Sequence, residues 1–353
     1  MKSKADSFYG GRELYPLGAP VSGRPRGEPP SEGRRAGGGR SRPRSCAGLG
    51  GAARRFGGGV GVVLLALGGM AWGQETNFNF QAVQAAADQG DAKARYELAC
   101  CYERGNGVPR DIAKAAALMR QSADQGYAPA EGQLGYYYGT GLGVAKDPAE
   151  AFSWYRKAAE QGNAVAELGM GNIYSTGRGV AKDMDQAVGW WRKAADQNDT
   201  PAEYALGELY FYGDSGSRSN YVNYAEAAKW FRKAAEQGEP RAMNNLGMMY
   251  DYGYIGKRDF NEAVKWYRQG AELGDAMAQG NLGTLYLDGR GVNKDMVQAY
   301  AWFTLAAEKG NGTGRMYLRE YASHQLLDTN QLAQAQQMVR AFHASHPSRL
   351  TAP

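Results

Sequence analysis

Residues 130–138 read AEGQLGYYY, and the spacing within this stretch recurs along the chain. An alanine is followed by a large apolar residue four positions later, a small residue five positions later and a tyrosine eight positions later. Six copies of this pattern begin at Ala94, Ala130, Ala166, Ala202, Ala242 and Ala278. Their starting positions differ by 36, 36, 36, 40 and 36 residues, and such a fixed period is typical of a repeat protein.

Each repeat is predicted to contain two helices, which we call the A helix and the B helix. Offsets 0, +4, +7 and +8 of the pattern share one face of an α-helix, so the pattern itself predicts the A helix. The B helix follows a turn and carries a large apolar residue at one fixed position, namely Leu118, Trp154, Trp190, Trp230, Trp266 and Trp302. Because five of the seven Trp residues occupy equivalent positions, we expect them to pack between helices and not to form a ligand cage.

Polar residues and glycines mark the ends of the B helices. Five B helices begin with an N-cap residue followed three positions later by Glu or Gln, as in Asp147/Glu150 and Asp259/Glu262, and this spacing predicts a capping box. In the first repeat Lys114 stands where the acceptor is expected. Residues that tolerate a left-handed backbone end the helices, namely Gly126, Gly162, Asn198, Gly238, Gly274 and Gly310.

A helical pair with one apolar face buries that face on its neighbours, so the repeats are expected to stack as a solenoid. The turns between A and B helices read G-x-G-V at 105–108, 141–144, 177–180 and 289–292. Together with the A-x-x-x-L-G-x-x-Y helix and a B helix such as AFSWYRKAAEQG at 151–162, these turns resemble the Sel1-like repeat over about residues 82–310. This family is related to the tetratricopeptide repeat, and the resemblance implies an all-α fold, an α/α right-handed superhelical solenoid.

The sequence predicts the following organisation. Residues 1–59 form an Arg/Gly/Pro-rich disordered leader, 60–73 the apolar part and cleavage site of a signal peptide, and 74–91 an N-terminal helical cap. Six repeats follow at about 92–126, 127–162, 163–198, 199–238, 239–274 and 275–310. Capping helices at 311–346 and a tail at 347–353 complete the chain. Two repeats depart from the G-x-G-V turn: the fourth has a longer polar loop at 213–221, and the fifth has GYIG at 253–256.

The first 73 residues indicate export. Arg54 and Arg55 precede an apolar stretch at 60–71, and Ala71 and Gly73 are the small residues expected at positions −3 and −1 of a cleavage site. We therefore expect cleavage between Gly73 and Gln74 and a periplasmic or secreted mature protein. The apolar stretch is too short for a stable membrane span. The 59 preceding residues exceed an ordinary n-region, which leaves the true translation start open.

Charge divides the chain at the same point. Residues 1–73 contain 12 basic and 4 acidic residues, whereas 74–353 contain 29 basic and 32 acidic residues. The overall charge of +5 therefore belongs to the leader, and no nucleic-acid partner is expected for the repeats.

Residues with catalytic or metal-binding chemistry are scarce. The three histidines, His324, His343 and His346, lie in the C-terminal cap, and we interpret them as surface residues. The G-x-G turns join two helices, whereas a dinucleotide-binding loop follows a strand. We expect no catalytic residue, no cofactor and no metal. The pattern places Cys101 in the core and leaves Cys100 open as a free or intermolecular thiol.

The varied positions of the A helices are the candidate site. Offsets +2, +6 and +9 lie opposite the core face, and in related repeats this side lines a concave groove. The candidate partner-binding residues are Tyr96, Tyr136, Asn172, Tyr204, Glu208, Phe211, Asn244, Met248 and Asp251. A fixed scaffold with a varied inner face is how repeat proteins bind other proteins.

The sequence thus predicts a non-catalytic scaffold that binds a protein partner in the bacterial cell envelope or outside the cell. The mature form is expected to have no membrane span, and its oligomeric state stays open. The alternative is a hydrolase or binding protein for cell-wall or β-lactam compounds. Cysteine-rich Sel1-like proteins with one disulfide per repeat are connected with β-lactam binding, but this chain lacks that set of cysteines.

Overall fold

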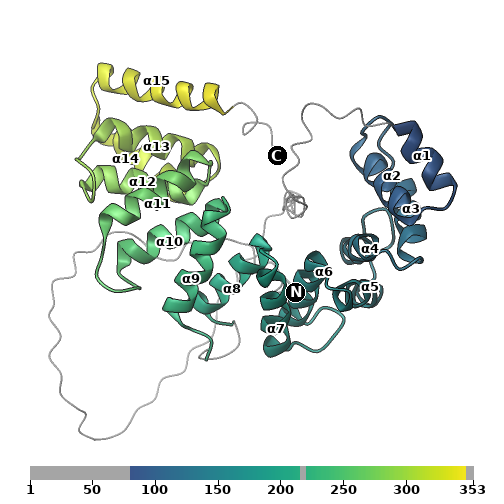
Figure 1. The fold of residues 1–353 in the computed structure, drawn as a ribbon. Coiled ribbons are helices and arrows are strands. Elements are labelled where there is room, and N and C mark those ends of the chain that lie inside the picture. Colours follow the sequence, from purple (N-terminus) through teal and green to yellow (C-terminus); the bar gives the residue numbers. More distant parts are fainter. Residues whose placement is uncertain (1–79, 215–219, 347–353) are drawn as a thin grey trace, which may run out of the picture. The chain divides into compact units, whose positions relative to one another are not determined.

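The computed structural model describes residues 80–214 and 220–346, and within these ranges the chain forms fifteen α-helices and no β-strand (Figure 1). Their bounds are α1 Phe80–Asp88, α2 Ala92–Arg104, α3 Ile112–Ala123, α4 Ala128–Thr140, α5 Pro148–Glu160, α6 Ala164–Thr176, α7 Met184–Asp196, α8 Thr200–Tyr212, α9 Tyr224–Glu236, α10 Pro240–Tyr252, α11 Phe260–Glu272, α12 Ala276–Asp288, α13 Met296–Glu308, α14 Gly312–His324 and α15 Thr329–Ser345. The expected leader, signal peptide and tail lie outside the described residues.

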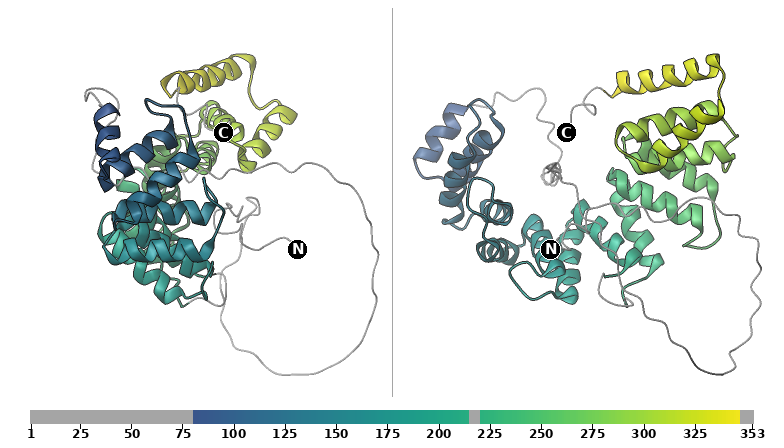
Figure 2. Two further views of the ribbon diagram at one scale, coloured as in Figure 1. Left: turned by 90° about the vertical axis from the view of Figure 1, so that its right-hand side faces the viewer. Right: turned by 180° about the vertical axis from the view of Figure 1, so that it is seen from behind.

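The helices alternate between two layers. The A helices are α2, α4, α6, α8, α10 and α12, and the B helices are α3, α5, α7, α9, α11 and α13. Each A helix packs against the B helix that follows it and against the helix that precedes it (Figure 2). Neighbouring A helices such as α4 and α6 also contact each other. This arrangement confirms the expected all-α repeat solenoid.

The paired helices run antiparallel, so that the end of a B helix lies near the start of its A helix and bonds to it. Gln161, which follows α5, donates from Nε2 to Glu131 Oε2 of α4 at 2.7 Å. The same bond joins Gln197 to Glu167 at 2.8 Å and Gln237 to Glu203 at 2.6 Å. These glutamates lie in the first turn of an A helix.

The N-caps of the B helices are confirmed, but the capping boxes are not. Asp147 and Asp259 accept bonds from first-turn N–H groups, as predicted. Glu150 does not return a bond, because the Asp147 N–H already donates to the Tyr138 carbonyl of the preceding A helix at 2.9 Å. The Glu150 carboxylate instead accepts from the indole Nε1 of Trp154 at 3.0 Å. The predicted glycine stops have left-handed backbones, as in Gly126 at φ 79°.

In the second to sixth repeats, an aromatic ring of the B helix lies on a glycine of the A helix. The predicted row of Trp residues is only partly buried, since Trp190 and Trp302 are half-exposed. The more deeply buried side chain belongs to the next residue of the B helix in the third to sixth repeats. In the fourth repeat, for example, a Cβ atom added to Gly207 would lie 2.5 Å from the ring of Phe231. The equivalent pairs are Gly135/Tyr155, Gly171/Trp191, Gly247/Tyr267 and Gly283/Phe303.

The G-x-G-V turns pack the repeats together. Gly291 has φ +67°, and a Cβ atom there would lie 2.4 Å from the carbonyl oxygen of Phe260, the first residue of α11 in the preceding repeat. A glycine is required at this position because both the backbone conformation and the close approach exclude a side chain. The glycines of these turns therefore have a packing role.

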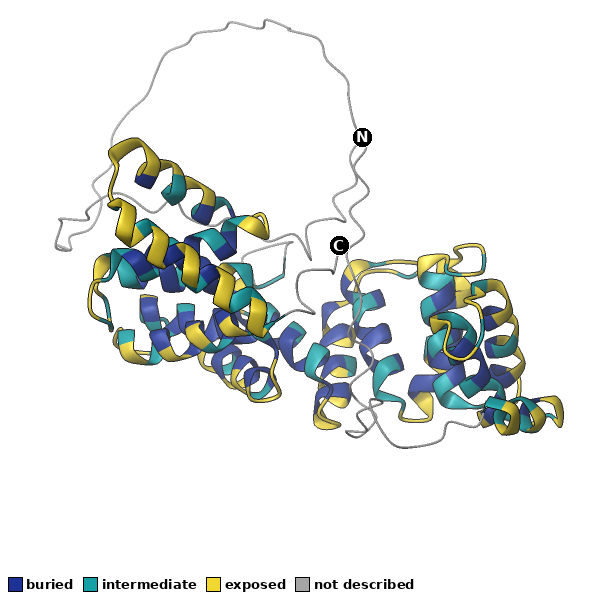
Figure 3. Ribbon diagram, turned by 90° about the horizontal axis from the view of Figure 1, so that it is seen from above, coloured by how far each residue is buried: buried dark blue, intermediate teal, exposed yellow. Residues whose placement is uncertain are grey.

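Three further helices flank the repeats. Helix α1 packs on α2, and both α14 and α15 pack on α13. Helix α15 begins with the predicted capping box, in which Asp328 and Gln331 bond reciprocally. Only Ala335 and Val339 of α15 are buried, and most of its other residues are exposed; Figure 3 colours the ribbon by burial. Among residues 80–214 and 220–346, no helix combines the length and apolarity that a membrane-spanning helix needs.

Candidate partner-binding surface

The nine candidate residues divide into two groups by burial. Tyr96, Tyr136, Asn172, Glu208 and Met248 are half-buried. Tyr204, Phe211, Asn244 and Asp251 are buried, with exposed fractions between 6% and 9%. We expected all nine to face solvent. The expectation is wrong for four of the nine residues. Side chains of adjoining helices cover this part of the face, so these four residues pack inside the protein.

The N-terminal end of this face is formed by tyrosines. Tyr96 makes an edge-to-face contact with Tyr127, with ring centroids 5.6 Å apart. Cys100 lies beside Tyr96, and burial raises the pKa of its thiol to about 11. Cys101 is buried, as predicted, and both thiols are free. Because the reactive form is the thiolate, the raised pKa makes Cys100 a poor nucleophile.

Asn172 has a structural partner. Its Oδ1 accepts a hydrogen bond from the indole Nε1 of Trp191 at 3.1 Å. Trp191 is the ring that rests on Gly171, so Asn172 supplies the polar partner that a buried indole needs. The Asn172 side chain is still partly accessible, and its amide group remains a possible contact for a partner.

A polar network occupies the face between α8 and α10. The Tyr204 hydroxyl donates to Glu208 Oε1 at 3.0 Å, and the guanidinium of Arg241 lies 4.4 Å from the Tyr204 ring centroid. Arg241 also pairs with Glu239, with Nε–Oε1 at 2.7 Å. Burial raises the pKa of Glu208 to about 7, while the Tyr204 hydroxyl and Arg241 act in the opposite direction.

The next stretch of the face is held by bonds between α10 and its neighbours. Asn281 donates from Nδ2 to Asn244 Oδ1 at 2.9 Å. Arg290 pairs with Asp251 at 2.8 Å and with Asp288 at 3.1 Å. Asn244 and Asp251 therefore join neighbouring repeats. Met248, in contrast, keeps a half-exposed thioether on the same face.

An aromatic cluster that the sequence analysis did not single out lies at the ends of α8 and α10. It consists of Phe211, Tyr212, Tyr224, Tyr252 and Tyr254, and we call it the tyrosine cluster. Phe211 is its centre, with ring centroids 4.7 Å from Tyr212, 5.4 Å from Tyr224 and 5.1 Å from Tyr254. The sequence contains a pattern that could have predicted this cluster, because its tyrosines lie in or beside the two turns that depart from G-x-G-V.

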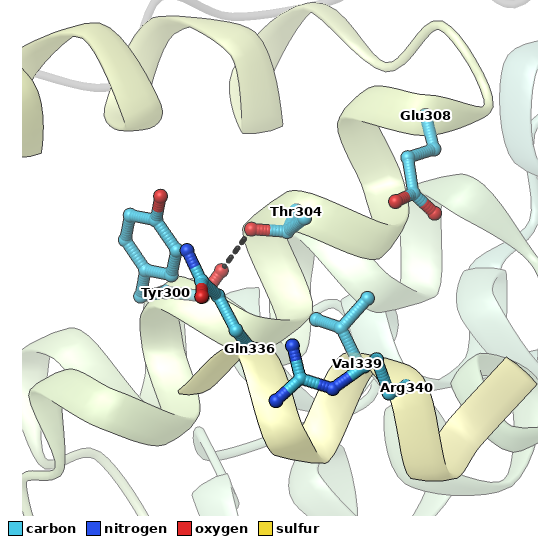
Figure 4. A pocket seen from close by; sticks show the side chains of 6 residues that line it. All are labelled: Tyr300, Thr304, Glu308, Gln336, Val339 and Arg340. Atoms are coloured by element: carbon cyan, nitrogen blue, oxygen red, sulfur yellow. Dashed lines mark hydrogen bonds between the residues drawn. The ribbon is translucent and has the colours of Figure 1, made fainter. Parts of the chain in front are cut away.

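A pocket lies between α13 and α15. It has a volume of about 260 Å³ and is lined by Tyr300, Thr304, Glu308, Gln336, Val339 and Arg340 (Figure 4). The Thr304 hydroxyl donates to the backbone carbonyl of Tyr300 at 2.9 Å. Glu308 also pairs with His343 of α15 at 2.9 Å, a contact between the last repeat and the following helix. Within the described ranges, no three His, Cys, Asp or Glu side chains are grouped as a metal site.

The sequence pattern of the Sel1 repeat family matches the chain six times, at residues 92–127, 128–163, 164–199, 200–239, 240–275 and 276–311. These matches cover more than half of the chain. No curated protein matches it.

Solved structures that are similar to this chain include the following two. A protective antigen present in uropathogenic Escherichia coli strains, which displays an SLR fold, is 35% identical with a TM-score of 0.68. The match covers 78% of this chain and 59% of that protein, so this chain spans only part of its length. A Sel1 repeat protein from Oxalobacter formigenes is 29% identical with a TM-score of 0.58, and the match covers 65% of this chain and 100% of that one.

Proposed function

Because the chain belongs to the Sel1 repeat family, we propose that it is an exported, non-catalytic scaffold that binds a protein partner through its A-helix layer. Sel1 repeat proteins generally act as scaffolds for protein–protein interaction, and the fold is typically non-catalytic. The cell-envelope or extracellular location, the absence of catalysis in this chain and the binding face are parts of the proposal.

The observation that carries the proposal is the contrast between a fixed framework and a varied face. Caps and ring-on-glycine contacts recur from repeat to repeat. The accessible offsets of the A helices instead change in chemistry, from Tyr96 and Tyr136 to Asn172, Glu208 and Met248. Aromatic and Met side chains are enriched at protein interfaces. Repetition without such variation would stabilise the stack but would select no partner.

Capture experiments with matched variants test the binding face. Tyr136→Ala should weaken capture of the partner and leave thermal stability nearly unchanged, because Tyr136 is half-exposed. Met316→Ala, at an exposed position of α14, is the surface control and should change neither property. Trp230→Ala is the packing control and should lower the free energy of unfolding by about 3–5 kcal/mol. Equal capture by wild type and Tyr136→Ala would contradict the assignment of this face.

The buried positions need a different interpretation. Tyr204→Ala would remove a side chain that is only 9% exposed, so any loss of binding would be mixed with a loss of stability. Binding by this part of the face is better tested at Glu208 and Met248, which are half-buried.

Export is tested by the N-terminus of the mature protein. Expression in a bacterial host with fractionation should yield a periplasmic or secreted product that begins at Gln74. Ala71→Lys should block processing, because signal cleavage requires a small residue at position −3. A stable cytoplasmic product that retains residues 1–73 would contradict the proposal.

A further inference from the structure

Helix α1 occupies the position of a B helix. The backbone N–H of Asp91, at the start of α2, donates to the Ala86 carbonyl of α1 at 3.1 Å. Asn163 makes the same bond to Ala158 of the B helix α5, also at 3.1 Å. Phe80, the first residue of α1, lies against the turn of the first repeat, just as the first residues of α3, α5 and α11 lie against later turns. Helix α1 therefore packs on α2 as the B helix of a preceding repeat would.

Helix α14 occupies the position of a seventh A helix. Its N-cap Asn311 accepts from the Gly314 N–H at 2.8 Å, as Asp275 does at the start of the A helix α12. Helix α14 is followed by Gln325 in a left-handed conformation with φ 47°, where each of the six A helices is followed by a glycine with positive φ. The chain thus begins a further repeat after α13.

The face of α14 that a B helix would cover is left open. The connection from α14 to α15 has four residues, whereas seven residues separate the A and B helices in five of the repeats. Helix α15 packs on α13 through Ala335 and Val339. Leu318 of α14 is half-buried and Arg319 is exposed, although the equivalent residues of α12 are buried. Helices α1 and α14 are therefore each half of a repeat.

A groove on α1 and α2 marks the place of the A helix that would precede α1. It has a volume of about 370 Å³ and is lined by alanines and Val83 of α1 and by Asp91 and Ala94 of α2. The residues of the third repeat at the positions of Asp91 and Ala94 are Asn163 and Ala166, and they lie against α4, the A helix before them. An A helix lying in this groove would meet α1 and α2 as α4 meets α5 and α6.

The mature chain is too short before α1 to fill this groove itself. With cleavage before Gln74, as proposed, six residues precede Phe80, whereas each A helix has 13 residues. A second copy of the chain can fill the groove, because its α14 is an A helix with an open face. Each copy offers the half repeat that the other copy lacks.

The side chains of the two half repeats match in size. In the second to sixth repeats, a glycine of the A helix receives a ring of the B helix. Arg319 stands at the glycine position of α14, and Val83 stands at the ring position of α1. A large residue on the A side thus meets a small residue on the B side. An aromatic residue at the ring position would clash with Arg319, which favours α1 over the B helices of the second to sixth repeats.

The charges at this contact have opposite signs. Within the stack, the residue at offset +1 of one A helix lies close to the N-cap of the next, since the charge of Glu167 contributes, after burial, to the raised pKa of Asp199. The equivalent residues at the contact are Arg315 of one copy and Asp91 of the other, and both are exposed. Two acids that oppose each other inside the stack are thus replaced by an ion pair between copies.

The other charged residues near the groove leave this pair favourable. Lys93 pairs with Glu97 at 3.8 Å, and Arg95 donates to a carbonyl at the end of α1 at 3.2 Å. With Asp88 and Asp91 included, the groove end has three acidic and two basic residues up to residue 97. Helix α14 has two arginines and one glutamate.

We infer that copies of the mature chain associate head to tail, with α14 of one copy lying in the groove of α1 and α2 of the next, so that two half repeats complete one repeat across the contact. The inference goes beyond the proposed function and rests on one part of it, the cleavage before Gln74 that leaves the groove open. Because the contact joins two different surfaces, each copy keeps one surface for a further copy.

Analytical ultracentrifugation of a chain that begins at Gln74, which contains every described helix, tests the inference. The mean mass should rise with concentration beyond that of a dimer. Ala82→Arg places a large side chain at an exposed position of the groove, and Arg315→Glu/Arg319→Glu reverses two exposed charges of α14. Each variant should weaken association by about tenfold or more and keep the melting temperature of the wild type.

A charge control and a mixing experiment complete the test. Arg178→Glu/Lys257→Glu makes the same change of charge at exposed positions of two turns and should associate like the wild type. A mixture of Ala82→Arg with Arg315→Glu/Arg319→Glu should form a dimer and stop there, because one intact α14 and one intact groove remain.

Three results would overturn the inference: a wild-type chain that stays monomeric over the whole concentration range, a wild-type dimer that adds no further copies, or a mixture of the two variants that does not associate. This chain is produced without residues 1–73, so its association is measured whether or not a cell cleaves the precursor. A failure of the head-to-tail contact is thereby separated from a failure of the proposed export.

Discussion

The glycine at offset +5 of the A helices is matched to the ring that rests on it. The first repeat differs: Ala99 replaces the glycine, and the flexible side chain of Met119 replaces the ring. A larger residue on the A helix is thus accompanied by a more adaptable residue on the B helix. Both side chains belong to one buried cluster. The sequence predicted a small residue at this offset of the A helix. It also predicted that the Trp position of the B helix packs between the helices, whereas the next residue of the B helix is the one that lies on the glycine. Adjacent B-helix residues diverge by about 100°, and the crossing of the two helices decides which ring points inward.

Gly207→Ala should therefore lower the free energy of unfolding by about 1–3 kcal/mol, because the added methyl group would overlap the Phe231 ring. Phe231→Met in the same chain should recover part of this loss by recreating the first-repeat pair. Urea unfolding of the two single variants and the double variant measures the coupling. Gly189→Ala is the control: it lies inside α7 with no atom near the added Cβ, and it should stabilise the protein by up to about 1 kcal/mol. Additive effects at Gly207 and Phe231 would refute the pairing.

At the scale of the helix, the A helices bury carboxyl groups near their N-terminal ends. Asp199, the N-cap of α8, and Glu203 in its first turn are 3% and 1% exposed. Burial raises the pKa of Asp199 to about 6 and that of Glu203 to about 7. Gln237 donates to Glu203 Oε2, but Oε1 has no partner within the described residues. The other described acids with resolved shifts, Glu131, Glu167, Glu208, Asp251 and Asp275, also have raised pKa values.

The stability of the fold should therefore fall as pH rises. Acids with raised pKa values bind more protons in the folded state than in the unfolded state, so their contribution is complete below the ordinary pKa near 4 and disappears as pH passes 6–7. The melting temperature should be higher at pH 5 than at pH 8. Glu203→Gln should remove much of the fall between pH 6 and pH 8, whereas Glu160→Gln at an exposed position should not. A melting temperature that rises over this interval would contradict the assignment.

The helix ends also show where prediction of the site was limited. Repeated Asp and Gly residues predicted the starts and stops of the B helices, because capping depends on local sequence. The burial of Tyr204 and Asn244 depends on how closely α8, α10 and α12 approach one another, and no local pattern specifies that distance. Arg290, which pairs with Asp251 across the boundary of two repeats, was likewise outside the reach of the sequence pattern.

At the scale of the whole stack, the repeats are joined only to their neighbours. Arg192, Arg232 and Arg268 of the B helices each donate to the hydroxyl of a tyrosine in the next A helix at 2.7 Å. Among the described residues, each helix contacts helices that are close in the chain order. Stability in such a stack is the sum of repeat terms and nearest-neighbour terms.

A change near one end should therefore loosen that end alone. Gly283→Ala would place a methyl group 2.8 Å from the Phe303 ring and should speed amide hydrogen exchange in α12 to α15. Protection in α2 to α5 should stay at the wild-type level, and mass spectrometry of peptic fragments can compare the two regions. Uniform loss of protection along the chain would show that the stack unfolds as one unit.

In the second to sixth repeats an aromatic ring lies on a glycine of the same repeat, as Phe231 does on Gly207, and Tyr155 also lies against Gly169 of the following repeat. The Arg–Tyr bonds, in contrast, cross from one repeat to the next, and the fourth and fifth repeats each supply a tyrosine at one boundary and an arginine at the other. A gene segment encoding one repeat can thus be duplicated or lost while the ring–glycine pairs inside each repeat stay together. The length of this protein is free to change during evolution by whole repeats, and each insertion would lengthen the partner-binding face by one further set of variable residues.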